Sequence, residues 1–176
     1  RSSGGIVIDA LNRLYTVDDG MRVDVFNSSG VQTAQYAGYG NTNGKLRSGD
    51  HGAGLNIAAS STLGFMYIPD VNASRVVKLS ITGTYSANIG SSGSTDGKFV
   101  NTKGVAIDPT GNLFVADTGN NRIQKFNSSN VYQSQFGSAG SGPGQFSNPE
   151  NIFIDPSGFI FVTDTNNHRI QKFTSS

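Results

Sequence analysis

Residues 104–126 read Gly-Val-Ala-Ile-Asp-Pro-Thr-Gly-Asn-Leu-Phe-Val-Ala-Asp-Thr-Gly-Asn-Asn-Arg-Ile-Gln-Lys-Phe, and residues 151–173 read Asn-Ile-Phe-Ile-Asp-Pro-Ser-Gly-Phe-Ile-Phe-Val-Thr-Asp-Thr-Asn-Asn-His-Arg-Ile-Gln-Lys-Phe. Matched positions of the two stretches are 47 residues apart. Two weaker copies precede them, one leading from Ile6 to Arg22 and one from Leu55 to Arg75. A period of this length indicates a repeat architecture, in which each copy must pack on its neighbours to bury its apolar side chains.

Each copy alternates short apolar runs with turn residues. In the third copy, β-branched and aromatic runs predict strands at 104–108, 112–117, 122–126 and 131–137. The intervening turns are short, so consecutive strands pair antiparallel. The second run is apolar on both of its faces, which predicts burial between two neighbouring sheets. Four strands per unit at this period are typical of β-propeller blades.

The third and fourth copies resemble the NHL-repeat family of β-propellers. The resemblance rests on residues 104–126, on the segment from Phe136 to Phe146, and on Asn167-His168-Arg169-Ile170, which is similar to the motif that names the family. It is weaker in the second copy, where Ala58 replaces the Asp of the first strand and Ser74 replaces the Asn before Arg75. We therefore expect an all-β chain of four-stranded antiparallel blades. The predicted region is 1–176, with repeats at about 5–46, 55–99, 104–146 and 151–176.

The fourth repeat ends just after its third predicted strand. Residues 1–5 are too short and too rich in glycine to supply a fourth, so we expect an open or incomplete ring. Three explanations stay open: a piece of a longer protein, a compact ring with an incomplete last sheet, or a strand supplied by another chain. An unpaired strand edge invites β-augmentation or head-to-tail assembly.

The composition argues against several classes of function. The chain has 13 Lys and Arg against 12 Asp and Glu, for a net charge of +1, and no cluster of basic residues. We therefore expect no nucleic-acid partner. No apolar run is long enough to span a membrane. The chain has no cysteine, which excludes disulfides and thiolate metal sites.

The same residues argue against catalysis. Some NHL propellers resemble peptidyl-amidating lyases, which hold zinc with several histidines, but this chain has only two histidines. It also has no Gly-x-Ser-x-Gly nucleophile elbow. We therefore expect no metal, no cofactor and no enzymatic activity.

An Asp that ends the second strand and an Arg that opens the third recur in every copy. Since all copies carry the pair, we interpret it as structural: the two residues cap the turn between them and form an ion pair within the blade. The four pairs are Asp18–Arg22, Asp70–Arg75, Asp117–Arg122 and Asp164–Arg169.

Loops that emerge on one face of the propeller supply candidate binding residues. These are polar side chains of the turns after the second strands and of the longest loop: Arg47, Asp50, His51, Asn120, Asn121, Asn166 and His168. Three Asn-x-Ser/Thr sequons are candidate glycosylation sites, at Asn27, Asn72 and Asn127, of which the first and last occupy the same turn in two copies.

The leading functional hypothesis is a non-catalytic scaffold that binds a protein or a glycan. A surface rich in Ser, Thr and Asn and poor in charge favours an extracellular or secreted location. The alternative is a structural subunit that self-associates through its open blade edge into a polymer or filament. A third hypothesis is that the chain is a fragment of an NHL propeller that either resembles an amidating lyase or binds RNA.

Overall fold

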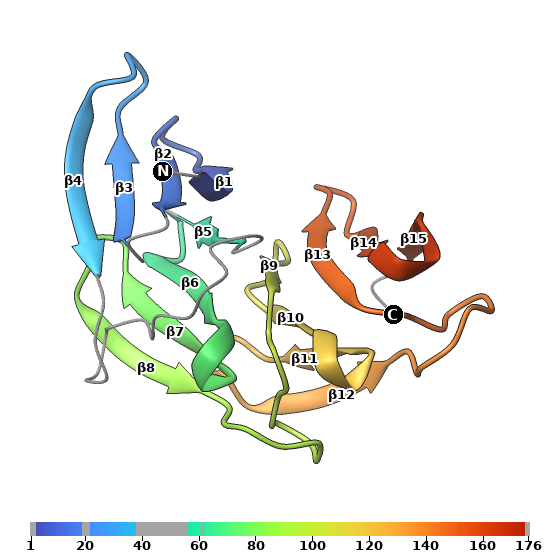
Figure 1. The fold of residues 1–176 in the computed structure, drawn as a ribbon. Coiled ribbons are helices and arrows are strands. Elements are labelled where there is room, and N and C mark those ends of the chain that lie inside the picture. Colours follow the sequence, from blue (N-terminus) through green and yellow to red (C-terminus); the bar gives the residue numbers. More distant parts are fainter. Residues whose placement is uncertain (1–2, 19–21, 38–55, 61, 175–176) are drawn as a thin grey trace.

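The computed structural model describes residues 3–18, 22–37, 56–60 and 62–174, and these form four antiparallel sheets arranged in an arc around a common centre (Figure 1). We call the sheets blades 1 to 4. Three have four strands each and blade 4 has three. The strands are β1 (Ser3–Ile8), β2 (Leu14–Asp18), β3 (Arg22–Phe26) and β4 (Gln32–Ala37) in blade 1; β5 (Ala58–Ser60), β6 (Phe65–Asp70), β7 (Arg75–Ser80) and β8 (Tyr85–Ile89) in blade 2; β9 (Gly104–Ile107), β10 (Leu113–Asp117), β11 (Arg122–Phe126) and β12 (Tyr132–Phe136) in blade 3; and β13 (Pro149–Ile154), β14 (Ile160–Asp164) and β15 (Arg169–Phe173) in blade 4.

The predicted fold class is confirmed. Blade 3 has its four strands within one residue of the predicted bounds, and all five residues of β10 are buried. Blades 1 to 3 each run in chain order from an inner strand at the centre of the arc to an outer strand at its rim, and blade 4 begins in the same way with β13 at the centre (Figure 1). The fifteen strands of the described residues equal the number expected from the repeats.

The turns between first and second strands are held by side-chain oxygens. Asp108 Oδ1 accepts hydrogen bonds from the backbone N–H groups of Thr110 and Asn112, and Asp9 and Asp155 do the same in blades 1 and 4. Such Asx turns replace backbone contacts that a tight turn cannot make. Burial opposes ionisation of Asp108, but hydrogen bonds from Asn112 and Thr110 outweigh it and hold the pKa of Asp108 below its ordinary value.

The turns between second and third strands are single 3₁₀ turns in blades 2, 3 and 4. They are η1 (Val71–Ala73), η2 (Thr118–Asn120) and η3 (Thr165–Asn167). Each ends on a residue in the left-handed conformation: Ser74 with φ 48°, Asn121 with φ 53° and His168 with φ 53°. Asn tolerates this conformation better than most residues, which accounts for the Asn before Arg122.

The hydrophobic core lies in the three seams between successive blades. One cluster joins blades 1 and 2 around Tyr15 and Met66, a second joins blades 2 and 3 around Phe99 and Leu113, and a third joins blades 3 and 4 around Phe146. Among the described residues no such cluster joins blade 4 to blade 1. The two blades therefore form the ends of the arc.

The inner strands of all four blades surround a small central cavity of about 170 Å³. Asn56, just before β5, reaches across this centre. Its Nδ2 donates to the carbonyl oxygens of Val105 (3.2 Å) and Ile152 (3.3 Å). One side chain at the start of blade 2 is therefore hydrogen-bonded to the inner strands of both blade 3 and blade 4.

Candidate binding surface

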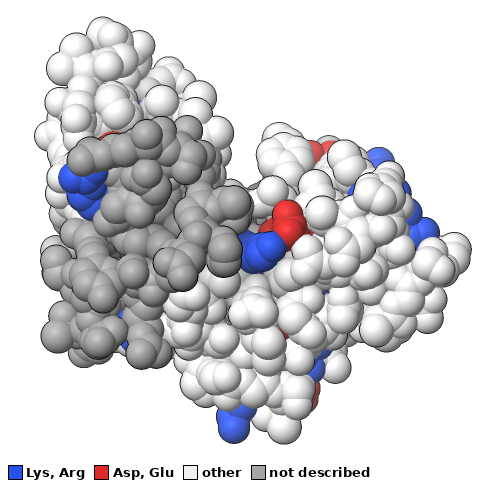
Figure 2. Space-filling model, viewed as in Figure 1, with Lys and Arg blue, Asp and Glu red and all other residues white. Residues whose placement is uncertain are grey.

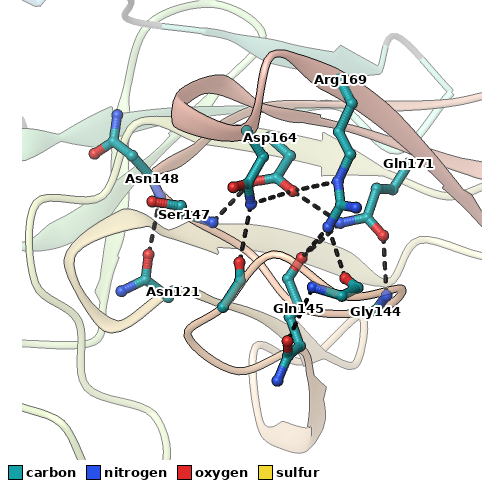
Figure 3. A network of polar contacts seen from close by, with 11 residues as sticks. Asn121, Gly144, Gln145, Ser147, Asn148, Asp164, Arg169 and Gln171 are labelled. Carbon is teal, nitrogen blue, oxygen red and sulfur yellow. Dashed lines mark hydrogen bonds and ion pairs between the residues drawn. The ribbon is translucent and has the colours of Figure 1, made fainter.

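A polar network centred on Asp164 holds the 3₁₀-turn side of blade 4 together (Figure 3). The buried carboxylate accepts hydrogen bonds from the backbone N–H of Ser147 (2.7 Å), from Asn167 Nδ2 (2.9 Å), from Arg169 Nε (2.8 Å) and from Gln171 Nε2 (3.0 Å). Burial opposes ionisation of Asp164, but these four donors outweigh it and lower the pKa of Asp164. The group is therefore a fixed anion in the folded blade.

The network also holds the connector 137–148 that joins β12 to β13. Arg169 Nη2 and Gln171 Nε2 both donate to the carbonyl oxygen of Gln145, at 2.9 and 2.6 Å. The N–H of Gly144 donates back to Gln171 Oε1 at 2.9 Å (Figure 3). Because the connector lies on the side of blade 4 that faces blade 3, the network fixes the entry of the chain into the blade.

Blade 3 repeats this network 47 residues earlier. The Asp117 carboxylate accepts from the N–H of Val100 (2.8 Å), Asn120 Nδ2 (2.9 Å), Arg122 Nε (2.7 Å) and Gln124 Nε2 (2.9 Å). Sequence reasoning singled out the Asp–Arg pair but missed Gln124 and Gln171. Their recurrence at the repeat distance was the signal that could have found them.

Three of the four expected Asp–Arg pairs are in contact. In blade 2, Arg75 Nε lies 2.9 Å from Asp70 Oδ2, as in blades 3 and 4. In blade 1 the side chain of Asp18 lies outside the described residues, and Arg22 opens β3. One part of the interpretation is wrong: none of the three carboxylates caps its 3₁₀ turn. In blades 3 and 4 the carboxylate binds the backbone N–H of the preceding connector, because it points into the blade.

The candidate binding residues fall into three groups. Asn120 and Asn121 are engaged in the scaffold: Asn120 Nδ2 donates to Asp117 and to the carbonyl of Gly93 (3.0 Å), and Asn121 Oδ1 accepts from the N–H of Asn148 (2.9 Å). The side chains of Asn166 and His168 are exposed at η3. The remaining three, in the loop before blade 2, lie outside the described residues: Arg47, Asp50 and His51.

The sequon residues lie at exposed turns. Asn27 Oδ1 accepts from the N–H groups of Ser29 and Val31, and Asn127 makes the two equivalent bonds in blade 3. Asn72 is exposed in η1. In Asn27 and Asn127 the oxygen organises the turn, and the nitrogen is the atom to which a glycan is attached.

Blade 4 presents an uncovered apolar face on the side away from blade 3. Phe153 is 61% exposed and Ile170 is 68% exposed, whereas their equivalents in blade 3, Ala106 and Ile123, are 7% and 0% exposed. Phe161 lies on the same face, with its ring centroid 6.2 Å from that of Phe153. We call Phe153, Phe161, Ile170 and Lys172 the free face of blade 4.

A separate groove of about 480 Å³ lies on the other side of blade 4, in the seam with blade 3. Its apolar lining comes from Phe114 and Phe136 of blade 3 and from Ile160 and Phe173 of blade 4. The groove runs beside β15, the last strand of the three-stranded sheet.

Charged groups are sparse on the surface shown in Figure 2. On the described part of this view, Lys and Arg are scattered and form no continuous patch. One ion pair links the start of blade 3 to that of blade 4, with Lys103 Nζ 2.6 Å from Glu150 Oε1. Within the described ranges, no three His, Asp or Glu side chains are grouped to hold a metal ion. No helix in this part of the chain has the length and hydropathy to cross a membrane.

Known proteins show the same fold and repeat. The NHL repeat matches residues 103–126 and 146–173. No curated protein matches the chain. Among solved structures, a Bacteroides thetaiotaomicron protein of unknown function aligns with 98% of the chain at 20% identity and a TM-score of 0.76. Streptogramin B lyase aligns with 96% at 14% identity and a TM-score of 0.63, and a chain of a nidogen/laminin complex with 98% at 16% identity and a TM-score of 0.66.

At these identities the likeness concerns the fold alone. The chain spans 47%, 53% and 64% of the length of these three solved chains. The two family matches cover strands β9 to β11 of blade 3 and β13 to β15 of blade 4, which carry the Asp, Arg and Gln side chains of the two networks. The chain therefore carries two NHL repeats, in blades 3 and 4, and its four radially arranged sheets form a β-propeller.

Proposed function

We propose that this propeller is a non-catalytic interaction scaffold and that the free face of blade 4 docks a protein partner. The observation that carries the proposal is the exposure of Phe153 and Ile170 on one sheet face. Exposed apolar residues that are contiguous mark interaction surfaces more often than scattered ones do. Aromatic side chains at the centre of such a surface contribute most of the binding energy in many interfaces.

The chemistry of the free face favours a protein over a glycan. Lys172 Nζ lies 3.7 Å from the ring centroid of Phe159 and 5.6 Å from that of Phe161, so its ammonium group packs over aromatic rings. Thr163 Oγ1 already accepts from the N–H of Asn151. A sugar site needs several polar groups around its aromatic platform, and here aliphatic and aromatic surface predominates.

The test is site-specific photo-crosslinking from the free face. A photoreactive phenylalanine analogue replaces Ile170 in one variant and Val131, an exposed residue on a turn of blade 3, in the control. We expect a defined protein to crosslink at 170 and not at 131. The double variant Phe153→Ser, Ile170→Ser should then weaken binding of that purified protein at least tenfold. Equal labelling at both positions, or binding of glycans that the double variant leaves unchanged, would contradict the proposal.

A second candidate function is self-assembly, because the opposite end of the arc is also uncovered. On blade 1, Ile6 is 64% exposed and Ile8 is 63% exposed. Contact between blade 4 of one copy and blade 1 of the next is heterologous, so it produces either a closed ring or a filament. Light scattering over a wide range of protein concentration tests it. Monomer mass throughout would exclude self-assembly, and a mass that rises with concentration and falls with Phe153→Ser would support it.

We further propose that the protein acts outside the cell and carries glycans at Asn27 and Asn127. The support is their exposed Asx turns together with the charge-poor composition. Secretion from a eukaryotic cell line, followed by glycosidase treatment and mass spectrometry, tests the two sites. A mass shift that is halved by Asn27→Gln and abolished in the double variant with Asn127→Gln supports the proposal, whereas an unshifted secreted chain rejects it.

A further inference from the structure

The outer strands of blades 1 to 3 form the rim of the arc, and in the described part of the chain their outer edges pair with no other strand (Figure 1). Alternate residues of such an edge strand direct their N–H and C=O groups away from the sheet. The edge is therefore a template on which another strand can pair. These three blades have all four strands, so their outer edges do not result from a missing strand.

The outer strands differ in charge from the strands next to them. Every second and third strand carries at least one charged residue. By contrast, β4, β8 and β12 contain no charged residue and no proline. Charged residues and proline are common means by which proteins protect an open edge. The protection of these edges is limited to their shortness and to the register shift at the start of each strand.

The three outer edges are not equally exposed. Among the side chains that the structure describes, β4 and β12 each have three exposed, whereas β8 has one, that of Ser86. The exposed side chains of the other two strands are all polar and uncharged: Gln32, Thr33 and Gln35 in β4, and Gln133, Ser134 and Gln135 in β12. Blades 1 and 3 therefore present the more accessible edges.

Two sequons lie beside these two accessible edges. Asn27 and Asn127 begin the turns that lead into β4 and β12, and their N–H groups donate to the carbonyl oxygens of Val31 and Val131 at 2.9 Å. In the described part of the chain, the Oδ1 atoms of both are hydrogen-bonded and the Nδ2 atoms are not, so each Nδ2 is available for a glycan. Blade 2, whose outer edge is less exposed, has Ser80 at this position and no sequon in the turn.

We propose that the outer edges of β4 and β12 pair with the same edges of a second copy of this chain, and that glycans at Asn27 and Asn127 prevent this pairing. The proposal rests on the glycosylation proposed above and gives it a role. A strand that pairs antiparallel with its own copy brings like side chains together, which is destabilising where they carry charge. The uncharged edges of β4 and β12 lack this repulsion, and a second copy therefore fits them.

The bulk of a glycan explains how it acts. An N-linked glycan is large and hydrophilic, so at the beginning of an edge strand it excludes a second chain without a specific contact. Two-fold pairing at one edge gives a dimer, and pairing at both edges of each chain gives larger assemblies. These contacts lie on the rim of the arc, away from the free face of blade 4. Edge pairing is thus separable by mutation from head-to-tail assembly.

The first test compares the secreted, glycosylated protein with the same protein after glycosidase treatment. Sedimentation velocity over a wide range of protein concentration measures the mass of both. We expect the glycosylated form to stay monomeric and the mass of the deglycosylated form to rise with concentration. Secreted Asn72→Gln is the control, because this sequon lies in η1 and not beside an outer strand. It should stay monomeric like the wild type.

Lysine substitutions test which surface pairs. Thr33→Lys and Gln133→Lys stand at equivalent positions and add a charge to the edges of β4 and β12. The double variant should weaken self-association of the deglycosylated protein at least tenfold. Ser86→Lys, at the equivalent position of β8, is the matched control and should leave it within twofold. In the unsubstituted deglycosylated protein, amide hydrogen exchange at 32–37 and 132–136 should slow as the protein concentration rises, and this measurement needs no variant.

The possible outcomes separate this proposal from those above. A deglycosylated chain that stays monomeric, or one that Phe153→Ser disperses and the two lysines do not, would overturn edge pairing. Mass spectrometry of the secreted protein tests glycosylation by itself. If the chain carries no glycan, the glycosylation proposal and the protective role fail together. Edge pairing is then tested on that chain, which should self-associate unless both lysines are present.

Discussion

Blades 3 and 4 share the same repeat pattern in different surroundings. Their Asp–Arg contacts agree within 0.1 Å, at 2.7 and 2.8 Å between Nε and Oδ2. Yet the side chain of Arg122 is 9% exposed and that of Arg169 is 30% exposed. Within the described part of the chain, blade 3 packs against a neighbouring blade on both faces, whereas blade 4 does so on one. The hydrogen-bond geometry is therefore set by the sequence of the repeat, whereas the burial of its side chains is set by the blades that pack against it.

The largest expected difference between the two blades concerns their core phenylalanines. Phe126→Ala should lower the free energy of unfolding by about 3–5 kcal/mol, because it empties a fully packed site between Phe99 and Tyr132. Phe173→Ala should cost less, about 1–3 kcal/mol, because part of its ring borders the open groove. Urea denaturation of both variants measures the difference. Equal costs would mean that the third seam is as well filled as the second.

Removal of the carboxylate at the centre of each network should also cost more stability in blade 3 than in blade 4. Asp117→Ala leaves Arg122 and Gln124 without their shared acceptor in a nearly closed site, which should cost about 3–5 kcal/mol. Asp164→Ala should cost about 1–3 kcal/mol, because water can reach the more exposed Arg169. Thermal unfolding followed by circular dichroism tests the order. A larger loss of stability in Asp164→Ala than in Asp117→Ala would show that water does not replace the hydrogen bonds that Arg169 loses.

The equivalent isoleucines isolate the effect of a neighbouring blade. Ile123→Ala should destabilise by about 2–4 kcal/mol, since it opens a cavity in the third seam. Ile170→Ala should change stability by less than about 0.5 kcal/mol, because this side chain contacts solvent. Both variants are compared by chemical denaturation at low protein concentration. A substantial cost at Ile170 that grows with protein concentration would instead indicate a covered free face.

The smallest expected effect is on the pH dependence of stability. The pKa of Asp164 is lowered in the folded chain, so its contribution is fully present above the unfolded pKa, near pH 4, and is lost as pH falls through the folded pKa. Asp164→Asn should therefore show a shallower loss of stability between pH 5 and pH 3 than the wild type. Asp108, whose pKa is also lowered, is unchanged in this variant, so the part of the pH dependence that Asp108 contributes should remain and serves as the control. Parallel curves for wild type and variant would contradict the assignment.

Much of the scaffold follows from spacing and residue type. The Asp-Pro turns, the Asp–Arg pairs and the left-handed Asn121 all involve residues within about five positions of each other. Local backbone preferences and short-range hydrogen bonds decide such features. Repetition of the pattern then predicts blades, because each unit has two apolar faces that only neighbours can cover.

The roles of individual polar residues were harder to predict. Asn120 resembled an exposed loop amide, but folding brings the carbonyl of Gly93 within 3.0 Å of its Nδ2. The pairing of Ala58 with Tyr67 also corrects the sequence alignment of blade 2: Ser60, and not Ala58, takes the place of the Asp of the first strand. Phe153 was overlooked although it stands where blades 2 and 3 have Ala58 and Ala106. The available signal was a large residue at a position that holds a small residue in the other two blades. Its meaning required knowledge of which face of which blade is covered.

Residues near one another in the chain account for the repeat period, the antiparallel strands and the Asp–Arg pairs, and these features could therefore be predicted without a structure. Tertiary structure alone decided that Ile123 is buried while Ile170 is exposed, and that one seam holds Tyr132 while the next holds a groove. The physical reason is that the hydrophobic effect scales with the area that neighbours remove from water. Repeats of similar sequence therefore differ in stability and in binding capacity according to what packs against them.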